Sequence, residues 1–365
     1  MAVPGFSGSD GGIGRKISPL SKGDLNCNVL LKKYRPPLDI SYFINNVCNL
    51  RCKHCYVAYE ENKNALSVKR WKEIFDELIS MGALTFGNVG KEPTLTWEKT
   101  EDLLHYFKEK RESITELRFG IVSNGTLMDK SKIEELETIQ PDYIDISIDS
   151  SKNIHDYIRG AGSYDKTISN LRVMSSYKLI KNVFVIFTAN KLNISTIGKL
   201  IDILYNIGVK NFLISPYITL KRNDELALSG DEFVNTVVNL LAGKVVDFGQ
   251  YKGIIIYIKN DYTTTRNIME AFVNRGIINK GNLFIDEYGI IFNKYTFNGN
   301  KIIFNYLPWD NTYVQAIRIS HDGYVSNCFD MFFPQYPERA IGNVRMNSIN
   351  KLLHCDTPQS VVANL

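Results

Sequence analysis

The sequence has no long apolar run and no block of charges of one sign. Its longest aliphatic stretch, residues 254–258, is far shorter than the ~20 apolar residues with which a helix crosses a bilayer. Residues 1–14 have neither the basic start nor the apolar core of a signal peptide. Lys and Arg are dispersed despite a net charge of +4, so no basic stripe indicates a nucleic-acid surface. We therefore expect a cytoplasmic protein that binds neither membranes nor nucleic acids.

Cysteine is also scarce, with six in 365 residues, yet three of the six lie within eight residues: Cys48, Cys52 and Cys55. Three neighbouring cysteines cannot all pair with one another, and nothing in the chain indicates export to an oxidising compartment. A disulfide framework is therefore not expected. A loop this short can instead direct three thiolates at one point, which suits a metal site.

The CxxxCxxC spacing leaves two kinds of metal site open. A zinc ion would take the three thiolates and His54 as its fourth ligand. Zinc ribbons, however, usually have a second CxxC pair about 15–20 residues further on, whereas the next cysteine here is Cys328. The alternative is a cluster that needs three protein ligands and keeps one coordination position open.

Beyond residue 37 the apolar runs alternate between strand-like and helix-like periods. Residues 67–81 and 194–207, for example, repeat apolar residues at helical spacing. Strands that alternate with helices predict a parallel sheet covered by helices, an α/β fold. The six strand-like runs are residues 38–44, 84–89, 117–122, 143–148, 183–188 and 211–214.

The pattern changes after Pro216, where β segments follow one another with Asn, Gly and Asp turns between them. Helices are expected at residues 230–241 and 264–275, and β segments at 282–285, 290–295, 301–306 and 313–320. The 44% hydrophobic and 22% charged composition is that of a globular protein. We therefore expect a flexible segment at 1–37, a main domain at 38–218 and a smaller α+β region at 219–365.

Polar residues follow each of the first four predicted strands. The cysteines come after the first strand, Gly90-Lys91-Glu92-Pro93 after the second, Ser123-Asn124-Gly125-Thr126 after the third, and Ser147 to Asp149 at the end of the fourth. Each short motif alone is also an ordinary turn or helix start. Because ligands bind at the carboxyl ends of parallel strands, their joint order indicates one site there.

In this order, the motifs resemble those of the radical S-adenosylmethionine (radical SAM) family, whose signature is CxxxCxxC followed by an aromatic residue, here Tyr56. The resemblance implies a partial (β/α)6 barrel. It implies one 4Fe–4S cluster held by Cys48, Cys52 and Cys55, with S-adenosylmethionine on the fourth iron. Reductive cleavage of S-adenosylmethionine then gives a 5'-deoxyadenosyl radical, and a flavodoxin or ferredoxin is the expected electron donor.

The resemblance also suggests residues that bind S-adenosylmethionine. Residues 90–93 are similar to the family's GGEP motif, which implies that Glu92 receives the methionine amino group. Lys91 departs from the motif, because the family usually has glycine there, and lysine would be strained if the position needs a positive φ. Residues 147–160 resemble S-I-D followed by H-D-x-I-R-G, which implies that Ser147 contacts the ribose and Arg159 the methionine carboxylate. The expected cofactor-binding set is Tyr56, Gly90, Lys91, Glu92, Pro93, Ser123, Asn124, Ser147, Asp149 and Arg159.

The C-terminal region resembles the SPASM/twitch extension of radical SAM maturases at residues 317–328 and 341–344, with a hairpin turn at Asp322-Gly323. The family's auxiliary clusters need more ligands than Cys328 and Cys355 supply, so no auxiliary cluster of the usual kind is expected. Cys328 either packs in the interior or donates a hydrogen atom, as in radical SAM epimerases. Cys27 and Cys355 are expected to be structural.

The expected function is abstraction of hydrogen from a small natural-product, sugar or peptide substrate, with epimerisation among the reactions considered. One alternative is a SPASM-type maturase that forms cross-links in a ribosomal peptide. Such enzymes often carry a leader-binding domain of some 80–100 residues, whereas only 1–39 precede the barrel here, which favours a small substrate. A second alternative is a non-catalytic metal-binding or regulatory protein, which would not need Glu92, Ser147 and Arg159 in register.

Overall fold

The computed structural model describes residues 39–55, 64–217, 224–241, 243–244, 247–259, 274, 283–285, 291–297, 299–306, 316–327 and 340–354. Several predicted features lie outside these residues. They are the segment 1–37, the helix at 264–275 apart from residue 274, and Cys27, Tyr56, Cys328 and Cys355.

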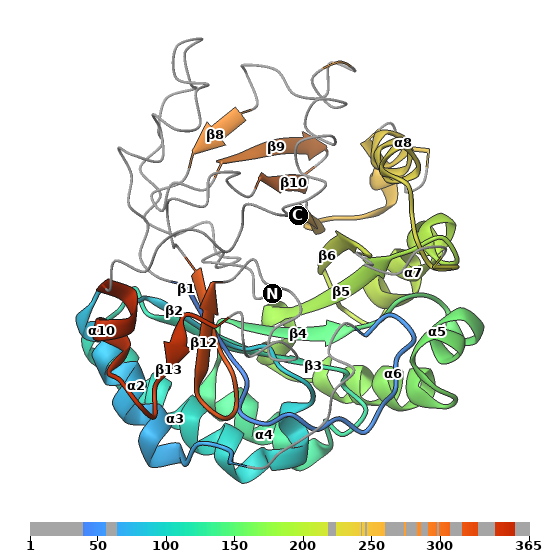
Figure 1. Cartoon of the computed structure of the whole chain (residues 1–365). Helices are drawn as coiled ribbons and strands as arrows, with labels where there is room; N and C mark the ends of the chain where they lie inside the picture. Colours follow the sequence, from blue (N-terminus) through green and yellow to red (C-terminus); the bar gives the residue numbers. More distant parts are fainter. Residues whose placement is uncertain are drawn as a thin grey trace.

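Six parallel strands, each followed by helix, form the centre of the molecule (Figure 1). The strands are β1 (Asp39–Tyr42), β2 (Thr85–Asn88), β3 (Arg118–Ser123), β4 (Tyr143–Ser147), β5 (Val183–Ala189) and β6 (Asn211–Pro216). The helices are α2 (Val68–Ser80), α3 (Trp97–Ser113), α4 (Lys130–Ile139), α5 (Lys152–Arg159), α6 (Ser163–Met174) and α7 (Ile197–Tyr205). Short 3-10 turns are η2 (Pro93–Thr96), η3 (Lys178–Asn182) and η4 (Ile194–Thr196).

The remaining described elements lie beyond residue 229. Two helices, α8 (Gly230–Leu241) and α10 (Ile349–His354), and the turn η5 (Phe248–Gln250) accompany the strands. The strands are β7 (Ile255–Lys259), β8 (Leu283–Ile285), β9 (Ile291–Phe297), β10 (Asn300–Tyr306), β11 (Ala316–Ile319), β12 (Tyr324–Asn327) and β13 (Gly342–Asn343).

These C-terminal strands extend both edges of the six-stranded unit. The order in the sheet is β13-β12-β11-β1-β2-β3-β4-β5-β6-β7-β10-β9-β8, and it is parallel from β11 to β10. β7 pairs with β6, while β11 pairs with β1 in the register Asp39 to Ala316. The strands on either side of the predicted boundary at residue 218 therefore share one sheet.

The outer helix layer forms because each helix buries one apolar face against the sheet. In α2, Ser67 caps the helix by accepting a hydrogen bond from the Arg70 N–H, and its buried side chains are Trp71, Ile74, Phe75 and Leu78. Burying an aliphatic or aromatic side chain of this size contributes about 1.5–3 kcal/mol. Figure 1 shows these helices along the outside of the curved sheet.

The concave side of the sheet has its own small apolar cluster, separate from the core under the helices: Phe43, Val89, Tyr143, Phe184, Leu213, Tyr257 and Ile303. Because side chains alternate along a strand, Tyr42 packs under the helices while Phe43 points to the other face. A Cβ on Gly120 would lie 2.6 Å from the Tyr143 ring, so this glycine makes room for the tyrosine. The sheet therefore buries apolar side chains on both of its faces.

The α/β fold class and the partial (β/α)6 barrel are confirmed, as is the hairpin at Asp322-Gly323, where β11 and β12 pair antiparallel. β7 could not be assigned from the sequence, because a five-residue apolar run fits a buried strand and a helix segment equally well. The pairing of the C-terminal strands with the barrel sheet was likewise not predicted.

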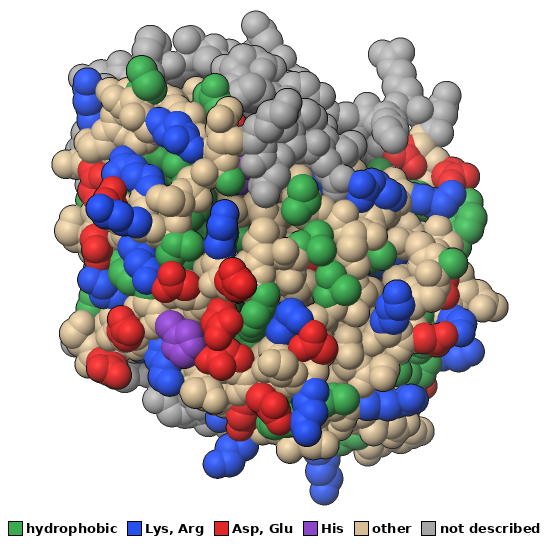
Figure 2. Space-filling model, turned by 90° about the horizontal axis from the view of Figure 1, so that it is seen from below, with side chains coloured by type: hydrophobic (Ala, Val, Ile, Leu, Met, Phe, Trp, Pro, Cys, Tyr) green, Lys and Arg blue, Asp and Glu red, His purple; other side chains and the backbone are tan. Residues whose placement is uncertain are grey.

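Two surface observations concern the expected partners. Among the residues that the structure describes, no helix combines the length and apolarity needed to cross a bilayer. On the face shown in Figure 2, Lys and Arg side chains alternate with Asp and Glu, so that face carries no continuous basic stripe.

Candidate active site

The predicted site residues meet at one edge of the sheet. Because β1 to β6 are parallel, their carboxyl ends lie on the same side, and the loops that follow β1, β2, β3 and β4 come together there. These loops carry the cysteines, Glu92, Asn124 and Asp149.

The cysteine loop is held by its own hydrogen bonds and by helix α5. The Leu50 N–H donates to the Cys48 Sγ at 3.4 Å, and the Cys55 N–H donates to the Cys52 carbonyl at 3.0 Å. The Lys53 N–H donates to the Ile158 carbonyl at 2.8 Å, which ties the loop to α5. Cys48 and Cys52 are half-buried and Cys55 is exposed, and none of the three is in a disulfide.

The spacing of the three thiols fits a ligand larger than a single ion. Sulfurs around one tetrahedral zinc ion, at 2.3 Å from the metal, lie about 3.8 Å apart. Within the described ranges, Glu101, His105 and Glu135 are the one set of three whose ligand atoms all lie within 4.8 Å of one another. The three sulfurs, with or without His54, are therefore spread too widely for one zinc ion, whereas an iron–sulfur cluster places each thiolate on a different iron.

Burial makes the thiols of Cys48 and Cys52 weaker acids. It raises the pKa of Cys52 to about 11, although the nearby Arg159 acts in the opposite direction. Burial likewise raises the pKa of Cys48. Thiolates at these positions therefore need a bound cation or cluster to stabilise them.

Asn45 links the cysteine loop to the loop after β2. Its Nδ2 donates to the Glu92 carbonyl at 3.0 Å and to the Thr96 Oγ1 at 2.8 Å, and its Oδ1 accepts from the Val47 N–H at 3.0 Å. The Glu92 N–H in turn donates to the Val47 carbonyl at 3.1 Å. Val47, the residue before Cys48, is thus hydrogen-bonded through both its N–H and its carbonyl group.

The Glu92 carboxylate is fully buried among neutral donors. Its Oε1 accepts from the Thr94 N–H at 3.1 Å, the Thr94 hydroxyl at 2.5 Å and the Ser123 hydroxyl at 2.9 Å. Its Oε2 accepts from the Asn124 N–H at 2.8 Å. Burial raises the pKa of Glu92, and these hydrogen bonds oppose that shift without reversing it.

Asn124 forms a second tie to the cysteine loop. Its Nδ2 donates to the Asn49 Oδ1 at 2.9 Å and lies 3.9 Å from the Cys48 Sγ. Thr126 completes the network, because its hydroxyl donates to the Asn124 Oδ1 at 2.6 Å and accepts from the Asn49 Nδ2 at 2.8 Å. The loops after β1 and β3 therefore share one set of side-chain hydrogen bonds beside Cys48.

Asp149 and Arg159 form a buried ion pair on the other side of the loop. The Arg159 Nε donates to the Asp149 Oδ2 at 2.6 Å, and the NH2 group donates to Oδ1 at 3.3 Å. The remaining NH1 group lies 4.0 Å from the Cys52 Sγ. Burial raises the pKa of Asp149, but Arg159 and His54 lower it more strongly together, so the net pKa lies below its usual range.

Two histidines flank this pair, the buried His155 and the half-buried His54. Burial lowers the pKa of both His54 and His155 to about 4, so both are neutral at pH 7. His155 accepts from the Asp149 N–H through its Nδ1 at 3.2 Å. The His54 Nε2 lies 3.8 Å from the Asp149 Oδ2, and its ring meets that of Tyr217 edge to face.

The GGEP-like turn has the strained backbone that the sequence suggested. Lys91 has a φ of 48°, in the left-handed region. A Cβ on the preceding Gly90 would lie 1.8 Å from the Phe43 ring, so only glycine fits there. Pro93 begins the 3-10 turn η2, and Ser147 ends β4 at the same edge of the sheet.

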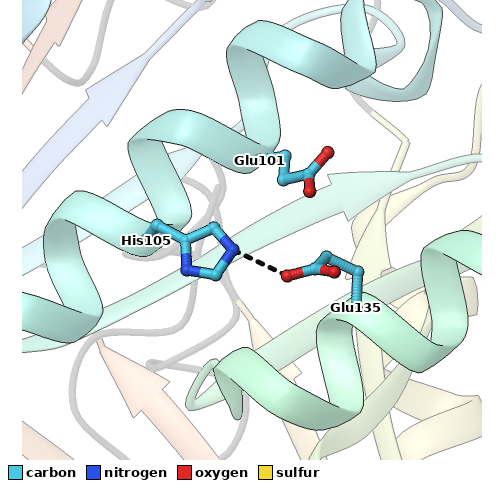
Figure 3. Close-up of side chains that lie close together, drawn as sticks. All are labelled: Glu101, His105 and Glu135. Carbon is cyan, nitrogen blue, oxygen red and sulfur yellow. Dashed lines mark hydrogen bonds and ion pairs between the residues drawn. The ribbon is translucent and has the colours of Figure 1, made fainter.

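The three potential metal ligands noted above, Glu101, His105 and Glu135, lie on the outer helix layer. Glu101 and His105 come from α3 and Glu135 from α4, and the His105 Nε2 lies 2.6 Å from the Glu135 Oε1 (Figure 3). All three are half-buried. The imidazole and the carboxylate already pair with each other, and the set is separate from the cysteine loop.

Sequence reasoning missed the polar residues that hold the loops in place. Asn45, Asn49, Thr94 and Thr126 were not selected, although each has hydrogen bonds to a predicted site residue or loop. The available signal was their position, because all four follow the ends of β1, β2 or β3. Asn and Thr are so common in turns that residue type alone does not distinguish them.

Residues 42–204 match the family model described as the radical SAM superfamily. The Fe-coproporphyrin III synthase of Methanosarcina barkeri is 32% identical over 160 residues, which are 43% of this chain and 38% of that protein. The subtilosin biosynthesis protein AlbA of Bacillus subtilis is 28% identical over 181 residues, 48% of this chain and 38% of AlbA. The matched region thus spans well under half of the length of these curated relatives.

Among solved structures, Streptococcus suis SuiB has a similar fold. The form bound to S-adenosylmethionine has a TM-score of 0.64 at 16% identity and covers 90% of this chain and 68% of SuiB. The form bound to the precursor peptide SuiA has a TM-score of 0.65 at 16% identity and covers 94% of this chain and 71% of SuiB. These matches support the fold, while the SPASM-like character of the C-terminal region stays a prediction.

Proposed function

The chain carries a radical SAM domain at residues 42–204, and from that premise we propose that it reductively cleaves S-adenosylmethionine and abstracts hydrogen from an organic substrate. A 4Fe–4S cluster and S-adenosylmethionine are the cofactors characteristic of this family. One observation carries the proposal for this chain. The Arg159 NH1 and the Asn124 Nδ2 approach the sulfurs of Cys52 and Cys48, which brings the predicted iron ligands and cofactor-binding residues to one strand edge.

In this proposal Cys48, Cys52 and Cys55 hold the cluster. When bound, the cluster and S-adenosylmethionine supply the 5'-deoxyadenosyl radical, and the electron comes from a flavodoxin or ferredoxin. The Leu50 N–H and the Asn124 amide lie close to the Cys48 sulfur and stabilise its negative charge. In this proposal the predicted main domain at 38–218 binds the cofactors and the C-terminal region at 219–365 serves in substrate binding.

Arg159 and Glu92 bind the two charged groups of the methionine moiety. Two nitrogens of the Arg159 guanidinium are fixed by Asp149, so the NH1 group is the one available to a carboxylate. Glu92 has three hydrogen bonds on Oε1 and one on Oε2, so Oε2 retains capacity to accept from an ammonium group. Ser147 is proposed to contact the ribose.

Anaerobic reconstitution with iron and sulfide, followed by dithionite and S-adenosylmethionine, tests the proposal. We expect about four irons per chain and formation of 5'-deoxyadenosine. Replacing all three loop cysteines with alanine should abolish iron binding. Arg159→Ala should weaken S-adenosylmethionine binding about ten- to a hundredfold while the cluster spectrum persists. Iron retained by the triple variant, or no 5'-deoxyadenosine from wild type, would refute the assignment and favour a non-catalytic metal-binding protein.

Two substrate classes are compatible with the site. A small natural product or sugar needs no leader-binding domain. A ribosomal peptide is favoured by the comparisons, since AlbA is described as a bacteriocin biosynthesis protein and SuiB was solved with a precursor peptide. Mass spectrometry of molecules that co-purify with the reconstituted protein separates the two, because a maturation substrate is genetically encoded and has a peptide fragmentation pattern.

Within either class, epimerisation is proposed with Cys328 as the hydrogen donor. In heavy water the wild type should then place one deuterium at the inverted carbon, because a thiol exchanges its proton with solvent. Cys328→Ala should still cleave S-adenosylmethionine but should yield oxidised or shunt products instead of the epimer. Normal product at a normal rate from this variant would contradict the donor role and favour dehydrogenation or cross-linking.

A further inference from the structure

Lys91 adopts a backbone conformation that lysine rarely occupies. Among the described residues, the non-glycine positions with positive φ are Asn64, Lys91 and Gln140. Asparagine tolerates this region, and Gln140 occupies the C-cap of α4, where left-handed residues commonly end helices. Lys91 has neither reason, and glycine would occupy its position without strain. Strain that is retained beside a candidate active site suggests a function for the side chain.

The backbone around Lys91 is fixed against the cysteine loop. On one side, Gly90 packs against the Phe43 ring, with no room for a Cβ. On the other side, the Glu92 N–H donates to the Val47 carbonyl, and Val47 immediately precedes Cys48. Lys91 is half-buried between these anchors. These anchors therefore fix the position of the Lys91 backbone relative to the first cysteine of the loop.

The charges near Cys48 are unevenly distributed. Lys91 carries its positive charge on the turn whose Glu92 N–H bonds the residue before Cys48, and the neighbouring Glu92 carboxylate is buried among neutral donors. On the opposite side of the loop, the Arg159 NH1 lies 4.0 Å from the Cys52 Sγ. One basic residue thus stands on each side of the cysteine loop, at the end of β2 in one case and in α5 in the other.

We propose that Lys91 sets the reduction potential of the cluster by placing a cation on the turn that is hydrogen-bonded to the cysteine loop, and that this role maintains a lysine where glycine would be less strained. The proposal rests on the proposed function, because it requires a cluster at Cys48, Cys52 and Cys55. A one-electron donor, dithionite in the test, adds one negative charge to the site and no proton. A nearby cation stabilises the more negative, reduced state more than the oxidised state, so it makes the cluster easier to reduce. Lys91 therefore acts as a positioning and tuning residue.

The test measures the midpoint potential of the reconstituted protein without S-adenosylmethionine, by redox titration followed by electron paramagnetic resonance. Lys91→Met keeps the length and removes the charge, and Lys91→Gly removes both the charge and the strain. Both variants should shift the reduction equilibrium about tenfold toward the oxidised state, a potential about 59 mV lower. Lys91→Arg should retain the wild-type potential.

Gln140→Gly is the matched control, since it relieves a left-handed residue at the end of α4, outside the loops at the strand edge. It should leave the potential unchanged. An unchanged potential in Lys91→Met and in a second neutral variant, Lys91→Gln, would refute the tuning role. An equal shift in Lys91→Arg would assign the effect to side-chain shape instead of charge and would also refute it. Failure of the wild type to take up iron would instead refute the proposed function.

Discussion

Glu92 and Asp149 are both completely buried at the carboxyl edge of the sheet, but their surroundings differ. Glu92, after β2, is held by three neutral residues, and burial leaves its pKa raised. Asp149, after β4, pairs with a buried guanidinium, and its pKa is lowered. Neutral donors stabilise a buried charge only partly, whereas an opposite charge in the same interior reverses the effect of burial. The β2 side of the site therefore accommodates a neutral side chain better than the β4 side.

The largest expected effect is loss of the Asp149–Arg159 ion pair. Asp149→Asn leaves the Arg159 guanidinium buried without a charged partner, which should lower the free energy of unfolding by about 3–5 kcal/mol. Glu92→Gln is the matched change on the other side, and it should cost about 1–3 kcal/mol because one hydrogen bond becomes a donor–donor contact. Urea denaturation of both variants measures the difference.

A double variant isolates the pair. If the cost of Asp149→Asn comes from the unpaired arginine, then adding Arg159→Met should recover part of the lost stability. Equal destabilisation by Asp149→Asn and Glu92→Gln would remove the distinction between the two sides of the site.

A smaller effect is expected in the pH dependence of stability. His155 has a folded pKa of about 4, below its value of about 6.5 in an unfolded chain, so its contribution is complete above pH 6.5 and declines as the pH falls toward 4. Between pH 7.5 and 5 this amounts to a loss of about 2 kcal/mol. The lowered pKa of Asp149 acts in the same direction at more acidic pH, since its contribution is lost as the pH falls through its folded value.

Glu92 should behave in the opposite way. Because its folded pKa is raised, its contribution is present at low pH and is lost as the pH rises through the folded pKa. In denaturation curves from pH 5 to 8, His155→Gln should therefore flatten the rise of stability with pH, and Glu92→Gln should steepen it. A change of slope in the same direction for both variants would contradict the comparison.

Much of the site could be predicted because its residues directly follow strands. The three cysteines, Glu92, Asn124 and Arg159 were all selected from motif order, and the structure brings them to one strand edge. The unusual lysine at position 91 indicated a left-handed backbone that the structure contains. The side chains that hold these residues could not be predicted. Asn45 and Asn49 form hydrogen bonds with residues that lie between 47 and 77 positions further along the chain. Such contacts exist only after the parallel strands have aligned.

The extent of the sheet could not be predicted for a related reason. The alternation of strand and helix specified β1 to β6, but pairing of β11 with β1 joins segments from opposite ends of the chain. The short apolar run that forms β7 did not indicate how long this strand is or which strand it pairs with. Local periodicity determines which segments become strands, and long-range packing determines which strands become neighbours.

The pairing of β1 with β11 has a consequence for synthesis of the chain. Asp39 pairs with Ala316, so one edge of β1 gains its partner only after about 280 further residues have left the ribosome. At about 5–20 residues per second, that takes about 14–56 seconds. Throughout this interval the strand that leads into the cysteine loop has an open edge, so this side of the sheet is completed only after β11 has been synthesised.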